Sequence, residues 1–177
     1  MSPSISSDAL LPDIGQYLTF QAAGESFAIG ILSIKEILEY ARLTTVPQMP
    51  AFVCGVMNLR GTVVPVIDLA QRLARAPTQP GRRSCIVIVE VRSEEQIQYI
   101  GVLVDVVHEV LGIADVDMLP APAFGSRLRA DFIKHMARTA KGFVVVLDID
   151  KALSIDEMAL LSQQAGREPA DSLGMMD

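Results

Sequence analysis

Few side chains in this sequence could carry out chemistry. The candidates are Cys54, Cys85, His108, His135, Asp148 and Asp150. A zinc site needs several Cys or His side chains at ligand spacing, and the chain contains neither CxxC nor HExxH. The GxSxG nucleophile motif, the GxxxxGK[ST] phosphate loop and GxGxxG are also absent. We therefore expect no catalytic residues, no metal site, no cofactor and no enzymatic activity.

Two interpretations are open for the carboxylate pair at Asp148 and Asp150. Residues two apart share one face of a strand, so the two carboxylates could act as an acid and a base. Alternatively, they mark the end of a strand and the cap of a following helix. Cys54 and Cys85 each lie in an apolar run, which favours buried free thiols over a nucleophile or a disulfide. A hydrolase is thus the weakest hypothesis.

Two other features are typical of a protein-binding surface. An aliphatic ladder places Ile31, Ile34 and Ile37 three residues apart, with Glu36 set into it. The ladder could belong to a closed core or could line a groove. Further on, Asn58-Leu59-Arg60-Gly61 predicts a tight turn, because Asn and Gly favour positive φ. Arg60 stands as a lone charge between apolar runs, where a planar guanidinium could anchor an interface.

The formal charge of −6 lies entirely at the two ends of the chain. Residues 1–15 carry a net charge of −2 and residues 156–177 a net charge of −4, so the segment 16–155 is neutral. A nucleic-acid binder needs a basic surface, and a single-strand binder also needs exposed aromatics, but only 5% of this chain is aromatic. Without a basic n-region or an apolar run of about 18 residues, we expect a cytoplasmic protein that does not insert into a membrane.

The elements that must position these residues are mostly strands. We predict strands at 16–21, 26–31, 84–91 and 142–149, and a short helix beginning at Asp68. A helix is also predicted around 50–55 and another over 150–164, whereas 31–40 fits either a strand or a helix. Residues 1–15 are expected to be a flexible tail, and 156–177 the end of a C-terminal helix and a flexible acidic tail.

An internal repeat divides the chain near 75–83. Residues 27–38 resemble 99–111, and residues 61–73 resemble 142–153 in the same order. This pattern predicts two similar β units of about 60–70 residues that share apolar surface, because each would be marginal alone. Whether the units exchange strands is left open.

Residues 46–69, VPQMPAFVCGVMNLRGTVVPVIDL, resemble the signature stretch of CheW-like domains, and the resemblance extends over 16–155. It implies a mainly β fold of two small five-stranded SH3/OB-like barrels on a shared apolar core, with short helices and a C-terminal helix. It also implies a non-catalytic adaptor that links the cytoplasmic tips of methyl-accepting chemoreceptors to the regulatory CheW-like domain of the histidine kinase CheA. Other CheW-like proteins are further candidate partners, and the adaptor would work in receptor arrays at the inner face of the membrane.

The resemblance also assigns roles to particular residues. It implies that a receptor tip, which is a helical hairpin, lies in an apolar groove. The receptor-binding positions are Leu18, Ile31, Ile34, Glu36, Ile37 and Val107. Arg60 matches a position needed for coupling, and Asn58 and Gly61 belong to the same turn. One departure from the family is His135. The family segment often reads aromatic-Ile-x-Gly, whereas here Phe132-Ile133-Lys134 is followed by His135.

Two alternatives to this function stay open from the sequence. The first is an adaptor of the same family that serves a pilus-based or other non-flagellar output. The second, from a different class, is a double barrel that binds a small ligand or an oligonucleotide.

Overall fold

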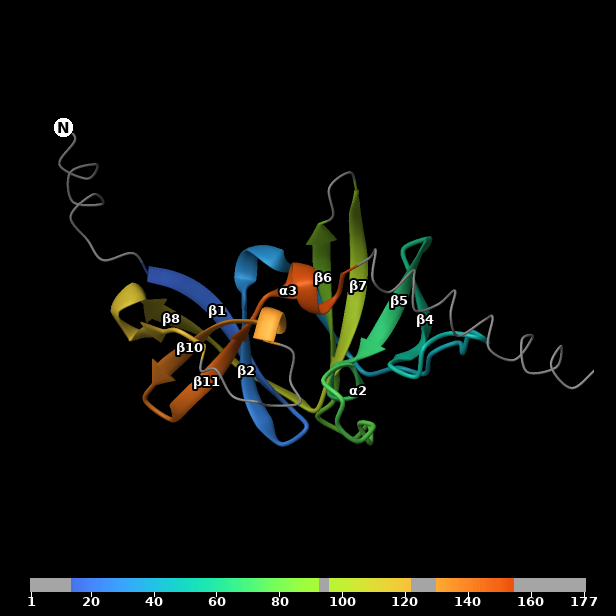
Figure 1. The fold of residues 1–177 in the computed structure, drawn as a ribbon. Coiled ribbons are helices and arrows are strands. Elements are labelled where there is room, and N and C mark those ends of the chain that lie inside the picture. Colours follow the sequence, from blue (N-terminus) through green and yellow to red (C-terminus); the bar gives the residue numbers. More distant parts are fainter. Residues whose placement is uncertain (1–13, 93–95, 122–129, 155–177) are drawn as a thin grey trace, which may run out of the picture.

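A computed structural model describes residues 14–92, 96–121 and 130–154 (Figure 1). These residues are mainly β and form two sheets, two α-helices of four residues and three short 3₁₀-helices. The expected N-terminal tail up to Asp13, and the C-terminal helix and tail from 155 onward, lie outside the described residues. Within the described residues, no helix is long and apolar enough to cross a membrane.

Sheet A has six strands. In spatial order they are β8 (Val106–Ala114), β1 (Ile14–Ala22), β2 (Glu25–Gly30), β11 (Gly142–Leu147), β10 (Ile133–Thr139) and β9 (Met118–Leu119). Sheet B has five strands. Their order is β3 (Ile34–Glu39), β6 (Cys85–Arg92), β7 (Ile97–Val104), β5 (Thr62–Asp68) and β4 (Val53–Leu59). Across the described residues neither sheet closes on itself, since no pairing joins β8 to β9 or β3 to β4.

Each sheet combines strands from both halves of the sequence. Sheet A joins β1 and β2 to β8, β10 and β11, whereas sheet B joins β3, β4 and β5 to β6 and β7. The two halves are joined by four pairings: β2 with β11 and β5 with β7 are parallel, and β1 with β8 and β3 with β6 are antiparallel. The hairpins β1–β2 and β6–β7 therefore exchange places between the halves, so neither half contains a complete sheet.

The repeat seen in the sequence has a structural counterpart. Helix α2 (Leu69–Arg72) follows β5, and helix α3 (Ile149–Ala152) follows β11. Asp68 and Asp148 cap these helices through their side chains. The backbone N–H of Asp68 donates to the carbonyl of Phe52 and that of Asp148 to the carbonyl of Phe132, both at 2.8 Å. The same backbone contact thus fixes the start of each helix.

The helix predicted around 50–55 is wrong. Residues 51–52 form a turn and β4 begins at Val53, because 53–59 pair with β5 as a hairpin. This tertiary pairing overrides the local preference near Pro50. The ambiguous segment 31–40 forms a 3₁₀-helix, η1 (Ile31–Ser33), and then strand β3.

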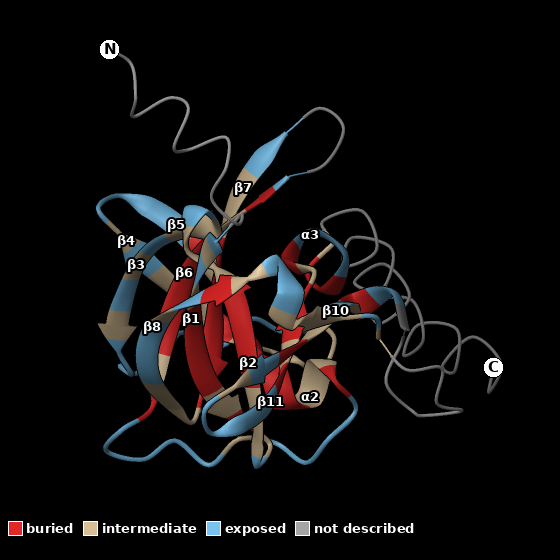
Figure 2. Ribbon diagram, turned by 90° about the vertical axis from the view of Figure 1, so that its left-hand side faces the viewer, coloured by how far each residue is buried: buried red, intermediate tan, exposed pale blue. Residues whose placement is uncertain are grey.

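The main apolar core lies between the two sheets. Sheet A contributes Leu18, Phe20, Phe27 and Ile29, and sheet B contributes Val87, Val89, Ile100 and Val102. The rings of Phe20 and Phe27 stack with centroids 6.0 Å apart. Figure 2 shows the buried residues concentrated on β1, β2 and β6. This shared core supports the edges of both sheets.

Arg72 lies between the two halves of the repeat. Its guanidinium carbon is 4.9 Å from the centroid of the Phe52 ring and 4.7 Å from that of Phe132. Its Nε donates to the carbonyl of Ala152 at 2.7 Å, at the end of the other helix. One side chain therefore joins α2, α3 and the aromatic residues that precede β4 and β10.

We expect Arg72→Ala to lower the free energy of unfolding by about 2–3 kcal/mol, because it removes two cation–π contacts and a charge-assisted hydrogen bond. Arg72→Lys should recover only part of the loss, since an ammonium lacks the planar fork. Urea unfolding measures both. The control is Arg75→Ala, which breaks the exposed Arg75–Glu25 ion pair and should cost less than about 1 kcal/mol. Equal costs for the two Ala variants would contradict a joining role for Arg72.

Candidate functional site

The aliphatic ladder lies on the edge of sheet B, where β3 follows η1. Residues three apart on a regular strand point to opposite faces. In β3 a register shift prevents this: Ile34 pairs with Val89, but Glu36 pairs with Ile88 and Ile37 with Val87. The extra residue, Lys35, is a β-bulge, and it turns Ile34 and Ile37 toward the same face. That face is the one that carries the core residues Val87 and Val89.

The predicted receptor-binding residues differ in accessibility. Ile37 is 42% exposed, Ile31, Ile34 and Val107 are half-buried, and Leu18 is only 2% exposed. Ile34 and Val107 pack against the core that contains Leu18. The side chain of Leu18 therefore supports the surface from below.

Strand β8, which is the edge of sheet A, carries related aliphatic residues. Its Val107 lies beside sheet B, since the backbone N–H of Val107 donates a hydrogen bond to the Cys85 sulfur. A register shift in β8 skips His108: Thr19 pairs with Glu109 and Phe20 with Val107. Val110, which pairs with Leu18 and is 50% exposed, therefore corresponds to Ile37. Val110 was not among the residues predicted from the sequence, although the repeat aligns it with Ile37.

Glu36 and Arg60 form an ion pair, although they belong to two separate features of the sequence, the aliphatic ladder and the turn. The guanidinium donates to the two carboxylate oxygens at 2.6 and 3.1 Å. The Glu36 side chain is 26% exposed and that of Arg60 is 74% exposed. Hydrogen bonds from Arg60 hold the pKa of Glu36 below its usual value, and the same contact raises the pKa of Arg60. The expectation of a lone charge at Arg60 is therefore wrong.

The turn that carries Arg60 is tight, as predicted, and Gly61 has the expected positive φ (88°). The second positive φ occurs at Arg60 (52°) and not at Asn58. Asn58 lies in β4, and its side-chain oxygen accepts a hydrogen bond from the Gly61 N–H at 2.7 Å. Asn58 thereby holds the turn closed, and the turn directs Arg60 toward Glu36 on β3.

The carboxylate pair has structural partners rather than the geometry of an acid and a base. Asp148 accepts from the N–H of Lys151 at 3.2 Å, as a helix cap. Asp150 accepts from the N–H of Arg92 at 2.9 Å and joins α3 to the end of β6. No cluster of three metal-ligating side chains occurs among the residues that the structure describes. His135 follows a bulge at Lys134 in β10, which is a local change at the departure from the family pattern.

The cysteines are free but only partly buried, so the expectation of fully buried thiols is not met. Burial, with a smaller effect of the nearby Asp68 charge, raises the pKa of Cys54 to about 11. Burial also raises the pKa of Cys85. Because the thiolate is the reactive form, neither residue is activated as a nucleophile.

Comparison with known proteins adds independent information. The family model of the CheW-like domain matches residues 16–157. A probable chemotaxis protein CheW of Rhizobium etli is 32% identical over 142 residues, which cover 80% of this chain and 89% of that protein. The chemotaxis protein CheW of Klebsiella aerogenes is 31% identical over 153 residues, covering 86% and 90%. The crystal structure of the scaffolding protein TtCheW from Thermoanaerobacter tengcongensis matches with a TM-score of 0.72 and 27% identity, over 82% of this chain and 95% of that one.

We expect Cys54 of a Cys85→Ser variant to react with iodoacetamide at pH 8 at least about 100-fold more slowly in the folded chain than in urea, because a free thiol has a pKa near 8.5. The folded chain keeps the Cys54 thiol protonated up to a pH of about 11, whereas the unfolded chain loses that proton near pH 8.5. The contribution of the protonated thiol to the free energy of unfolding is therefore complete below about pH 8.5 and is lost as the pH rises toward 11. Mass spectrometry of timed samples measures the reaction. Comparable rates in the folded and unfolded chains would contradict the raised pKa.

Proposed function

The chain belongs to the CheW-like domain family, and we propose that it couples methyl-accepting chemoreceptors to the histidine kinase CheA as a non-catalytic adaptor. The observation that carries the proposal is the apolar surface between the edge strands β3 and β8. It is built from aliphatic side chains, and no activated nucleophile or metal cluster lies among the described residues. Such a surface suits protein binding, with aliphatic contacts supplying the affinity.

The partner at this surface is a helical hairpin at the cytoplasmic tip of a receptor. Helix-in-groove binding uses apolar anchors at i, i+3, i+4 and i+7 of the helix, and those anchors need apolar walls. Ile34 and Ile37 form one wall, and Val107 and Val110 form the other, with Leu18 beneath them. Ile31 extends the first wall into η1.

A second contact involves the turn from Asn58 to Gly61. Arg60 keeps most of its side chain exposed while Glu36 holds it by two hydrogen bonds. A guanidinium fixed in this way is pre-organised for a planar, charged partner group. We assign this contact to the coupling of receptor state to CheA activity.

The remaining parts of the proposal concern assembly. The adaptor works at the inner face of the membrane, in arrays that contain the CheW-like domain of CheA and other CheW-like proteins. Closure of the two sheets into barrels, as the family resemblance implies, stays a prediction. The expected number of five strands holds for sheet B, whereas sheet A has six. The oligonucleotide alternative is not favoured, because the exposed aromatic residues of the described part are Tyr40, which follows β3 of sheet B, and Phe143, which lies in β11 of sheet A, and the two form no stacking platform.

We expect Ile34→Asp to weaken the binding of a receptor-tip hairpin by about 2 kcal/mol, or about 30-fold in Kd, because it places a charge in an apolar wall. Ile37→Asp changes a more exposed residue of the same wall and should act in the same direction with less effect on folding. Calorimetric titration of the hairpin measures both. The matched control is Val116→Asp, since Val116 is 78% exposed and lies in the 3₁₀-helix η2 (Asp115–Asp117) of the other half. Wild-type affinity in folded Ile34→Asp and Ile37→Asp would refute the assignment of the groove.

We expect Arg60→Ala to leave the fold and hairpin affinity intact but to lower receptor-dependent CheA activity at least several-fold in a reconstituted array. The reason is that Arg60 is exposed and lies outside the apolar walls. A Glu36→Arg, Arg60→Glu double variant distinguishes a direct contact between the Arg60 guanidinium and the partner from a role of the Glu36–Arg60 ion pair itself. If the guanidinium itself meets the partner, the exchanged pair should fail to restore coupling. Wild-type coupling in Arg60→Ala would show that Arg60 has no such role.

A further inference from the structure

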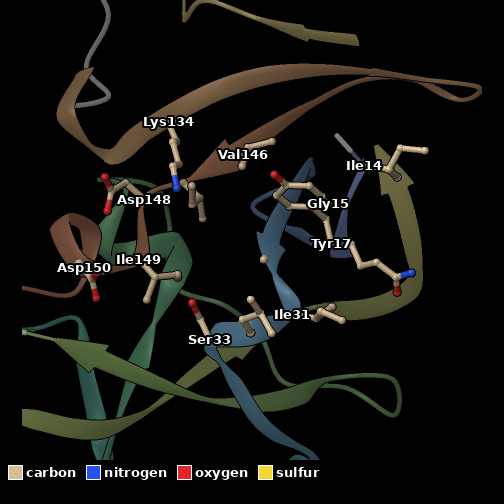
Figure 3. Close-up of a pocket in the computed structure, with 14 residues that line it drawn as sticks. Ile14, Gly15, Tyr17, Ile31, Ser33, Lys134, Val146, Asp148, Ile149 and Asp150 are labelled. Atoms are coloured by element: carbon tan, nitrogen blue, oxygen red, sulfur yellow. The ribbon is translucent and has the colours of Figure 1, made fainter. Parts of the chain in front are cut away.

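A second apolar cluster packs against sheet A, and a pocket opens at each end of it. At one end lies a pocket of about 470 Å³ beside η1, where Tyr17 and Val146 of the cluster contribute to the lining (Figure 3). At the other end lies a smaller pocket of about 290 Å³, whose lining includes Leu111 and Val144 of the same cluster. We call this smaller pocket the end pocket. It is also lined by Gln21, Ser26, His108, Glu109, Lys141 and Phe143.

The internal repeat identifies the place in sheet B that is equivalent to the end pocket. The parallel pairings of β2 with β11 and of β7 with β5 have the same register in the repeat, and they give Ser26 and Tyr99 equivalent positions. The antiparallel partners agree, since Ser26 pairs with Gln21 and Tyr99 pairs with Glu90 in the two exchanged hairpins. The place that Ser26 leaves open in sheet A therefore corresponds to the place of Tyr99 in sheet B.

In sheet B, the side chain of Tyr99 fills this place. It packs against the apolar cluster of that sheet, which includes Val64, the equivalent of Val144. The Nζ atom of Lys35 lies 5.5 Å from the centroid of the Tyr99 ring. In sheet A the bulge equivalent to Lys35 carries His108, which lines the end pocket. One half of the molecule thus shows the kind of group that fits the open place in the other half, namely an aromatic ring.

The end pocket also contains polar groups that lack partners. The side chains of Gln21 and Ser26 belong to half-buried residues, and neither makes a hydrogen bond to another residue of the described part. An amide and a hydroxyl can both bond to the phenolic O–H of a tyrosine, a group that usually finds a hydrogen-bond partner when it is buried. These two side chains therefore favour a tyrosine over a phenylalanine as the occupant.

The rim of the end pocket has the form of a protein interface. The Phe143 side chain is 58% exposed, and an exposed ring at a pocket can stack on the ring of an occupant. Outside it, the Lys141 ammonium lies 3.8 Å from a carboxylate oxygen of Glu109, and both side chains are open to solvent. Interfaces commonly place an aromatic anchor in a pocket and surround it with a polar rim, so this arrangement favours a protein over a free small molecule.

We propose that the end pocket is a docking site for a tyrosine side chain of a partner protein. The tyrosine ring packs against His108 and Phe143, and its phenolic O–H bonds to Gln21 or Ser26. Sheet B does not offer the same site, because its own Tyr99 occupies the equivalent place. The end pocket is separate from the apolar walls of the proposed receptor groove, and its docking role does not depend on the receptor.

The side chain of tyrosine by itself provides a probe, in the form of p-cresol. Titrated into the ¹⁵N-labelled full chain and followed by NMR, p-cresol should bind with a Kd on the order of 1 mM, as expected for a fragment of this size. The largest changes in chemical shift should fall on the amides of Ser26, His108 and Phe143. N-acetylleucinamide, which lacks a ring, should bind at least tenfold more weakly than N-acetyltyrosinamide. Shift changes that miss these three amides, or equal binding of the two amino-acid amides, overturn the site.

Ser26→Tyr supplies the missing ring from within the chain, as Tyr99 does in sheet B. The variant should keep the fold, raise the urea midpoint of unfolding and weaken p-cresol binding at least tenfold. Phe143→Ser changes an exposed rim residue and should weaken binding at least threefold, which keeps the test decisive if Ser26→Tyr does not fold. The matched control is Val116→Tyr, which adds a tyrosine at an exposed position outside the pocket and should bind p-cresol as the wild type does. Unchanged binding in folded Ser26→Tyr or in Phe143→Ser overturns the proposal.

Two further measurements test the source of the tyrosine. N-acetyltyrosinamide carries a peptide group on each side of the residue and should bind at least as tightly as p-cresol. Markedly weaker binding would show that the pocket admits a free phenol but no polypeptide, and would overturn the docking of a protein. Sedimentation velocity should show no self-association that Ser26→Tyr removes. A wild-type dimer that this variant dissociates would identify the occupant as a second copy of the chain and overturn the assignment to a different protein.

Discussion

Four strand pairings between the halves determine the rest of the architecture: β2 with β11 and β5 with β7, which are parallel, and β1 with β8 and β3 with β6, which are antiparallel. Each joins a strand from one half of the chain to a strand from the other half. Neither half can complete a sheet without them, so the halves must fold together. The shared core between the sheets is then a consequence of the exchange, since β1 and β6 bring their apolar faces to the same interface. The mutual positions of the sheet edges are fixed by the same pairings.

The exchange also explains where the binding surface lies. Strands β3 and β8 are equivalent in the repeat, and each becomes the edge of its sheet. Each carries one bulge, at Lys35 and at His108, and in each the bulge turns two aliphatic residues three apart toward the core face. The proposed groove therefore has two related walls, Ile34 with Ile37 and Val107 with Val110. A hairpin of antiparallel helices has a similar approximate two-fold relation, which fits the proposed partner.

Much of this arrangement could be predicted from the sequence, because apolar periodicity and the repeat report on local pattern. The mainly β fold, the helix start at Asp68 and the tight turn before Gly61 follow from such signals. The shared face of Ile34 and Ile37 could not be predicted, since it depends on a bulge that only the pairing with β6 creates. The contact of Glu36 with Arg60 was also hidden, because the two residues lie 24 positions apart and meet only when sheet B curls enough to bring the turn after β4, at one edge, to β3, at the other. The wrong helix at 50–55 has the same origin, in that local preference gave way to a hairpin.

The repeat is imperfect, and its differences make the two ends of the molecule chemically distinct. The counterpart of the Glu36–Arg60 pair is Glu109 with Lys141. The Lys141 ammonium lies 3.8 Å from one carboxylate oxygen of Glu109, whereas Arg60 donates two hydrogen bonds to Glu36. A guanidinium can bind both carboxylate oxygens at once, whereas an ammonium binds as a point charge, so only one end presents a fixed planar group. Arg72 breaks the symmetry again, because the equivalent position in α3 is Ala152 and the side chain reaches across to it. An adaptor with two identical ends would bind the same partner at each end. Because the two sheets of this chain differ in their charged side chains, their surfaces can bind different partners.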